Sequence, residues 1–123
     1  MDPKSNEKYH HRLKALMDEY AHLTYSLTKR FPREEIYGVT SQLRRAALSV
    51  VLNYVEGYAR ERDRVHQNFL EISYGSLKES KYLIEFSRKE GYISEEDCKT
   101  ALQLEDSIGG MLYGTIRSVK TKE

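Results

Sequence analysis

The stretch SQLRRAALSVVLNYVEGYARER, residues 41–62, decides how this chain folds, because it is apolar on two sides of one helix. At about 100° per residue, one side collects the apolar residues expected of a helix-bundle core. These are Ile36, Val39, Leu43, Ala46, Ala47, Val50 and Tyr54. Leu48, Leu52 and Val55 project from a different sector of the helix, roughly 90° or more away.

A helix that is apolar on both sides must be covered on both sides, and a chain of 123 residues offers few elements to do so. We therefore predict a homo-oligomer whose interface contains Leu48, Leu52 and Val55. The alternative is that this helix lies deep between neighbours of its own chain.

A narrow polar stripe separates the two apolar sides. It consists of Gln42, Arg45, Ser49, Asn53, Glu56 and Arg60, at steps of three or four residues. Such neighbours on a helix surface predict a chain of hydrogen bonds through Arg45, Ser49, Asn53 and Glu56. Flanked by apolar surface, the stripe is expected to fix the register of assembly. A nucleic-acid or ligand site is the alternative interpretation.

The apolar periodicity predicts four helices and no strand, at about residues 7–29, 33–56, 63–89 and 95–119. Pro32 suits the first turn of the second helix, and Gly57 is expected to end it as a left-handed cap. Short connections between helices of similar length predict an all-α, antiparallel up-down-up-down four-helix bundle. The bundle is expected to be a single domain over residues 1–123 and to assemble as a ring-like homo-oligomer.

Two patterns of small residues indicate close helix packing. Serines recur on one face of the third helix, and adjacent glycines interrupt the fourth. The serines are Ser73, Ser76, Ser80 and Ser87, and the glycines are Gly109 and Gly110. The serines are expected to let a neighbouring helix approach and to bond back to backbone carbonyls. The glycines predict either close helix contact or a kink.

The composition is that of a charge-coated helical protein, with 39% hydrophobic and 32% charged residues and a net charge of +1. No tract of about 18 apolar residues occurs, so we expect no membrane span. The first residues lack the apolar segment of a secretory signal. Because the one cysteine, Cys98, has no partner for an internal disulfide, the expected location is the cytoplasm.

The sequence offers no catalytic, metal-binding or cofactor-binding constellation, so we predict a protein that is not an enzyme. The four histidines include no pair four residues apart, which a helical metal site would require. The segment from Asp63 to His66 has the spacing of half a di-iron motif, but it occurs once.

The distribution of arginines indicates a candidate RNA-binding face. Seven of the ten arginines lie within residues 30–64, where no lysine occurs after Arg30. The candidate nucleic-acid-binding residues are Arg44, Arg60, Arg62, Arg64 and Tyr58. An oligomer would repeat this basic and aromatic joint around its axis. Because Glu61 and Asp63 interleave with the arginines, ion pairs are the alternative use of these charges.

Several motifs occur together in order. Over residues 31–94 they are, in order, Phe31-Pro32, Tyr37-Gly38, Gln42, Arg44-Arg45-Ala46, Ser49, Asn53, Glu56-Gly57, Phe69-Leu70, Ile72 and Gly75-Ser76-Leu77. This pattern resembles the bacterial proteins encoded in 23S rRNA intervening sequences, which are also described as ribosomal-protein-like. Val51, Tyr54 and Ser73 depart from it, where the family often has proline, isoleucine and alanine. Without that proline, the second helix is expected to be straighter here.

The resemblance implies a four-helix bundle that assembles as a homopentameric ring. It also implies a link to rRNA biology and no established catalytic activity. The expected function is a non-catalytic homo-oligomeric scaffold whose partners are other copies of itself, with no membrane. The alternative is an RNA-binding protein, or a partner of an RNA-associated protein, that uses an arginine-rich face of the oligomer. A fold-level analogy extends to the accessory protein of diversity-generating retroelements, which engages a reverse transcriptase and nucleic acid.

Overall fold

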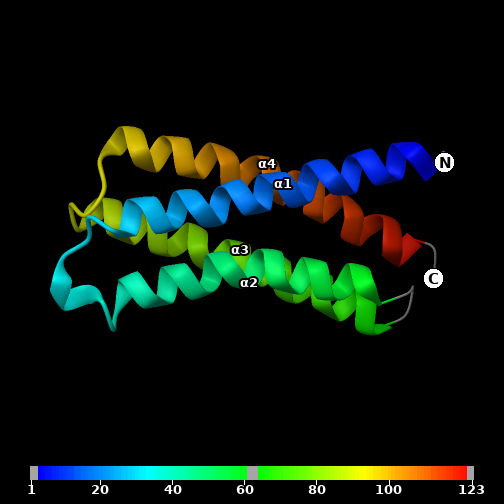
Figure 1. The fold of residues 1–123 in the computed structure, drawn as a ribbon, viewed down its shortest axis with the longest axis horizontal. Coiled ribbons are helices and arrows are strands. Elements are labelled where there is room, and N and C mark those ends of the chain that lie inside the picture. Colours follow the sequence, from blue (N-terminus) through cyan, green and yellow to red (C-terminus); the bar gives the residue numbers. More distant parts are fainter. Residues whose placement is uncertain (1–2, 61–63, 122–123) are drawn as a thin grey trace.

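The computed structural model describes residues 3–60 and 64–121 of the chain. This part contains four α-helices and no strand: α1 (Pro3–Thr28), α2 (Val39–Ala59), α3 (Arg64–Lys89) and α4 (Glu95–Thr121). Each helix packs against the next, and α1 also contacts α4, which closes the arrangement. In Figure 1, the α1–α2 and α3–α4 connections lie at one end of the molecule, and both chain termini lie at the other. The all-α prediction with four helices is thus confirmed.

The connection between α1 and α2 differs from the prediction. A continuous helix was expected from residue 33, but Arg33–Glu35 form the 3-10 turn η1, and α2 begins only at Val39. The α2 N-cap residue, Gly38, provides no side-chain hydrogen bond. The Glu35 carboxylate from the turn before it accepts the Val39 backbone N–H at 3.3 Å and so satisfies one free donor where α2 begins. Ile36, expected in the core, lies before α2 and is 54% exposed.

The same carboxylate joins this connection to the one between α3 and α4. The Tyr92 hydroxyl donates to Glu35 at 2.7 Å, and this bond raises the pKa of Tyr92 to about 12. Gly38 allows the arrangement, because a Cβ there would lie 2.5 Å from Glu35 Oε1. The two connections at this end therefore share one carboxylate.

The prediction that Gly57 caps α2 is wrong, because α2 continues to Ala59 and Gly57 is buried within it. Among the described residues, the glycine with positive φ is Gly91, just after α3. Gly57 is instead the point of close approach between α2 and α3. A Cβ there would lie 2.9 Å from Phe69 Cβ and 3.3 Å from the His66 carbonyl oxygen.

The core contains mostly aliphatic residues and a few buried polar ones. Ser80 and Ser87 are fully buried and donate to carbonyls of their own helix, as the serine pattern predicted. The Tyr20 and Ser80 hydroxyls also share a hydrogen bond of 2.7 Å. Gly109 is buried beside Leu77, in ordinary contact, which fits the prediction of close helix packing.

One carboxylate lies in this core. Glu105 is 1% exposed and accepts a hydrogen bond of 3.1 Å from Lys78 Nζ. Burial opposes the charge of Lys78, but the bond to Glu105 and its negative charge outweigh burial and raise the pKa of Lys78. The pair therefore keeps a buried acid satisfied between α3 and α4.

The Gly57→Ala substitution is expected to destabilise the fold by about 1–3 kcal/mol, because the added methyl group would push α3 away from α2. Gly110→Ala is the matched control: a Cβ there meets no atom within 4 Å, so we expect stabilisation of about 0.4–1 kcal/mol. Urea unfolding followed by circular dichroism measures both. Equal effects of the two substitutions would contradict the close approach at Gly57.

Candidate functional site: an exposed face on α2 and α3

An apolar surface lies along the outward side of α2 and α3. Leu48, Leu52 and Val55 of α2 are 37%, 62% and 43% exposed, and Ile72 of α3 is 51% exposed. We call these four residues, together with Gly75 and the residues that line the groove described next, the α2–α3 face. The opposite side of α2 packs into the core through residues such as Leu43, Ala47, Val50 and Tyr54. Within one chain, α2 is therefore apolar on a buried side and on an exposed side.

An open groove of about 640 Å³ lies in this face, between the two helices. It is lined by Gln42, Arg45, Ala46, Leu48, Ser49, Leu52, Asn53, Ser76 and Glu79. The lining therefore contains the first four residues of the polar stripe. It also contains Leu48 and Leu52, two of the three residues predicted from the sequence to lie in an oligomer interface. The buried Ala46 of α2 and, from α3, Ser76 and Glu79 complete it.

The hydrogen bonds of the stripe differ in part from the predicted chain. Asn53 Nδ2 donates to the Ser49 carbonyl and hydroxyl oxygens, both at 2.8 Å. Ser49 then bonds across to the Ser76 hydroxyl at 2.7 Å rather than to Arg45. Glu56 leaves the chain and pairs with Arg60 at 2.7 Å. The network therefore joins α2 to α3 as well as running along α2.

The contribution of α3 to this face was missed from sequence alone. Ile72, Gly75 and Glu79 recur at steps of three and four residues, which places them on one side of a helix. This spacing could have revealed the α3 part of the face. It was overlooked because the serines of α3 were interpreted as the packing side of the helix. Ser76 lies at the border between that packing side and the exposed side.

The candidate RNA-binding residues are not gathered in one place. Arg44 lies sixteen residues before Arg60, about 24 Å along the helix axis. Its Nε donates to Thr28 Oγ1 at 2.8 Å, and its guanidinium stacks 4.7 Å from the centre of the Tyr25 ring. Arg44 thus joins α2 to α1.

At the other end of α2, Arg60 pairs with Glu56 and lies 5.9 Å from the Phe69 ring centre. Arg64 is exposed at the start of α3, and Tyr58 is 51% exposed. Arg62 lies outside the described residues. Among the described candidates, Arg64 and Tyr58 are therefore the two that are exposed and form no ion pair.

Histidines and tyrosines cluster at the same end. His10 of α1 shares a hydrogen bond with the Tyr54 hydroxyl of α2, and its ring lies 4.4 Å from that of Tyr58. His66 of α3 donates from Nδ1 to the Gly57 carbonyl. Burial, and secondarily the charge of His66, lower the pKa of His10 below its ordinary value. This cluster thus favours a neutral His10 in the folded protein.

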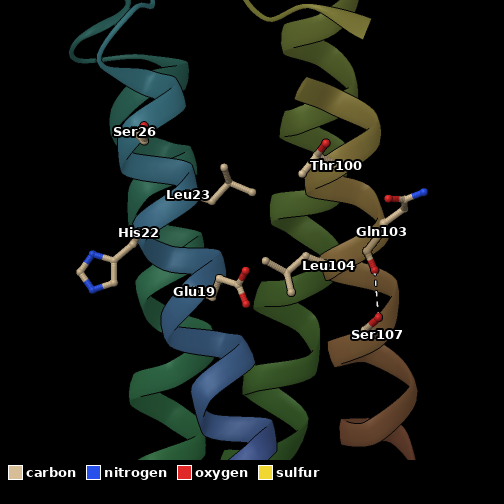
Figure 2. Close-up of a pocket in the computed structure, with 8 residues that line it drawn as sticks. All are labelled: Glu19, His22, Leu23, Ser26, Thr100, Gln103, Leu104 and Ser107. Carbon is tan, nitrogen blue, oxygen red and sulfur yellow. Dashed lines mark hydrogen bonds between the residues drawn. The ribbon is translucent and has the colours of Figure 1, made fainter. Parts of the chain in front are cut away.

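A second open groove, of about 580 Å³, lies between α1 and α4. Figure 2 shows Leu23 and Leu104 pointing toward one another across it, whereas His22 points away. The Ser107 hydroxyl donates to the carbonyl of Gln103 in its own helix. Among the side chains described, no group of three or more His, Cys, Asp or Glu gathers as a metal site. No described helix is long and apolar enough to cross a membrane.

The fold and this face together define a small all-α protein with an exposed apolar surface on two adjacent helices. Residues 12–114 match the model of the 23S rRNA-intervening sequence protein family, and the chain belongs to that family. The resemblance drawn from the motifs is thereby confirmed. No curated protein matches the chain.

A similar solved structure is that of a protein of unknown function from the S23 ribosomal protein family of Bacteroides thetaiotaomicron VPI-5482. It is 21% identical, with a TM-score of 0.78, over 85% of this chain and 97% of that one. This likeness supports the fold.

Because the folded state holds the pKa of His10 below 6.5, the unfolded chain binds more protons between that lowered value and 6.5. Stability from this group is present above about pH 6.5 and is lost as the pH falls through the lowered pKa. We expect the free energy of unfolding to fall as the pH drops below about 7.5 and through the lowered pKa of His10, and to fall less in His10→Gln. His11→Gln, at the exposed neighbouring position, is the control. An identical pH profile for His10→Gln and the unaltered protein would contradict this role.

Proposed function

We propose that the protein is a non-catalytic homo-oligomeric scaffold of the 23S rRNA-intervening sequence family. In this proposal, antiparallel up-down-up-down bundles assemble as a ring, a homopentamer, in the bacterial cytoplasm. The observation that carries the proposal is the exposure of Leu52 and its neighbours on a helix whose other side is already buried. Contiguous exposed apolar surfaces are uncommon on monomeric proteins and often mark interaction sites, which supports this assignment.

Energetics support a protein partner for this face. Covering the exposed part of a half-exposed Leu, Ile or Val side chain contributes about 1 kcal/mol. Leu48, Leu52, Val55 and Ile72 offer four such contributions at one contact. In a ring, each copy would make the contact twice, and closure would add further stability because the last contact is intramolecular.

A scaffold also suits the chemistry of the side chains. Among the described residues, several buried polar side chains bond to another helix, such as Ser73 to the Val50 carbonyl at 2.6 Å, whereas Ser87 bonds within its own helix and the buried Thr40 hydroxyl has no partner. The buried Glu105 is paired with Lys78. None of these groups is arranged as a nucleophile with a base beside it, which an enzyme of acyl or phosphoryl transfer would need.

The test is Leu52→Glu, which places a charge at the most exposed leucine of the face. We expect the oligomer to dissociate to a folded monomer of 14.4 kDa, because a carboxylate would be desolvated there. Light scattering coupled to size-exclusion chromatography gives the mass, and circular dichroism checks the helices. Tyr37→Glu, at a 94% exposed position off the face, is the control and should leave the mass unchanged. A Leu52→Glu variant with the mass of the unaltered protein would refute the assigned interface.

A second candidate function is RNA binding by the end of the bundle where α2 and α3 meet. Its support is the half-exposed Tyr58 ring beside His10, with the exposed Arg64 at the start of the next helix. Aromatic rings stack with bases, and arginines contact phosphates without sequence preference. The pairing of Arg60 with Glu56 and the packing of Arg44 on Tyr25 reduce the number of free arginines for this role.

RNA binding predicts that Tyr58→Ala and Arg64→Glu each weaken retention of structured RNA in a low-salt filter-binding assay, by about fivefold or more. Retention should also fall steeply as salt is added. Arg33→Glu, at the opposite end of the molecule, is the control with the same charge change. If the unaltered protein retains no RNA at low salt, this second candidate is excluded and the scaffold remains.

A further inference from the structure

The groove of the α2–α3 face contains two opposite charges that have no partner in the described chain. Arg45 stands on the α2 wall and Glu79 on the α3 wall, and both are exposed. Among residues 3–60 and 64–121, neither forms an ion pair or a side-chain hydrogen bond. The nearby charges of α2 are used differently, since Glu56 is already paired with Arg60.

The register of the two helices puts these charges at one end of the groove. Ser49 of α2 bonds to Ser76 of α3, and the course of the chain in Figure 1 takes α3 back along α2. Arg45 lies one turn before Ser49, and Glu79 lies about one turn after Ser76, so both stand on the same side of that bond. Leu52 and Ile72 lie on the other side of it. The face therefore has a charged half and an apolar half.

Gly75 supplies a second observation on the same face. It lies in the middle of α3, where glycine costs about 1 kcal/mol relative to alanine. A Cβ there would meet no atom within 4 Å, so packing inside this chain does not require the glycine. The missing side chain leaves room for a neighbouring backbone to approach this face, as it also does at the open Gly110 of α4.

We propose that Arg45 of one copy pairs with Glu79 of the next copy and so fixes the register of assembly. The inference rests on the proposed homo-oligomer and names its specificity-determining pair. A contact between the α2 wall of one copy and the α3 wall of another brings Arg45 of the first copy to Glu79 of the second. The apolar halves supply the contact area, and the charges select one alignment, because a shifted alignment would bury each of them unpaired.

Charge reversal tests the pair. Arg45→Glu and Glu79→Arg should each raise the dissociation constant of the oligomer by about tenfold or more, because each places like charges opposite one another. The double variant restores opposite charges and should return the constant to within about threefold of the unaltered protein. Lys99→Glu on α4 is the control for the change in net charge, and sedimentation velocity provides the constants.

Two outcomes would overturn the inference. In the first, the single variants Arg45→Glu and Glu79→Arg leave the dissociation constant unchanged, while Leu52→Glu still dissociates the oligomer. The proposed function would then stand without this pair. The second is a double variant that stays as dissociated as the single ones. An unaltered protein that is monomeric would instead refute the proposed function itself.

An Arg45–Glu79 pair inside one chain can be distinguished from a pair between copies by measuring unfolding in the Leu52→Glu variant, which is expected to be monomeric. There, the two reversals should change the free energy of unfolding additively if the partner belongs to another copy. A coupling between them in that monomer would show an internal pair and would contradict the inference.

Discussion

The packing of α2 is the constraint on which the rest of this structure depends. On its inner side, α2 approaches α3 closely enough that Gly57 cannot accept a Cβ without displacing Phe69 or the His66 carbonyl. Ser73 and Ser76 of α3 then reach the Val50 carbonyl and the Ser49 hydroxyl across the same contact. These contacts fix the rotation of α2 about its own axis. Once that rotation is set, Leu52 and its apolar neighbours must point outward, because they share the helix with the residues that point inward.

The polar groups of the bundle follow from the same packing. Several helix contacts contain a hydroxyl, carboxyl or imidazole group whose partner lies on the neighbouring helix, while the buried Thr40 hydroxyl has no partner in the described part of the chain. The Tyr20 hydroxyl meets Ser80, Glu105 meets Lys78, and His10 meets Tyr54. Such satisfied groups stabilise one arrangement of helices over others, because a rotated helix would leave them buried and unpaired. In the groove of the α2–α3 face, Arg45 and Glu79 remain open to another molecule.

Much of this fold is predictable from periodicity. The number of helices, the ends of α3 and the start of α4, and the two-sided character of α2 all follow from the spacing of apolar residues. The start of α2 was not predictable, because it depends on the Glu35 carboxylate reaching Val39, a contact set by the fold around Tyr92. The role of Gly57 was also hidden, since a glycine near a helix end equally suggests a cap or a close approach.

About half of the candidate site, the part on α2, was predictable from the sequence. The α2 residues stand out because a surface helix should be polar where Leu52 lies. The α3 residues do not, since Ile72, Gly75 and Glu79 are individually ordinary on a helix surface. They became part of one face only when the register of α2 and α3 was known. The arginines show the reverse: their clustering in sequence suggested one basic patch, but Arg44 packs on α1 while Arg60 binds Glu56.

The central claim is that another copy of the chain covers the outward side of α2. Sedimentation velocity of the unaltered protein at micromolar concentration tests it most directly. The account predicts a single species with a mass that is a multiple of 14.4 kDa, five times that value for the proposed ring. A stable monomer of 14.4 kDa, with Leu52 open to solvent, would contradict it.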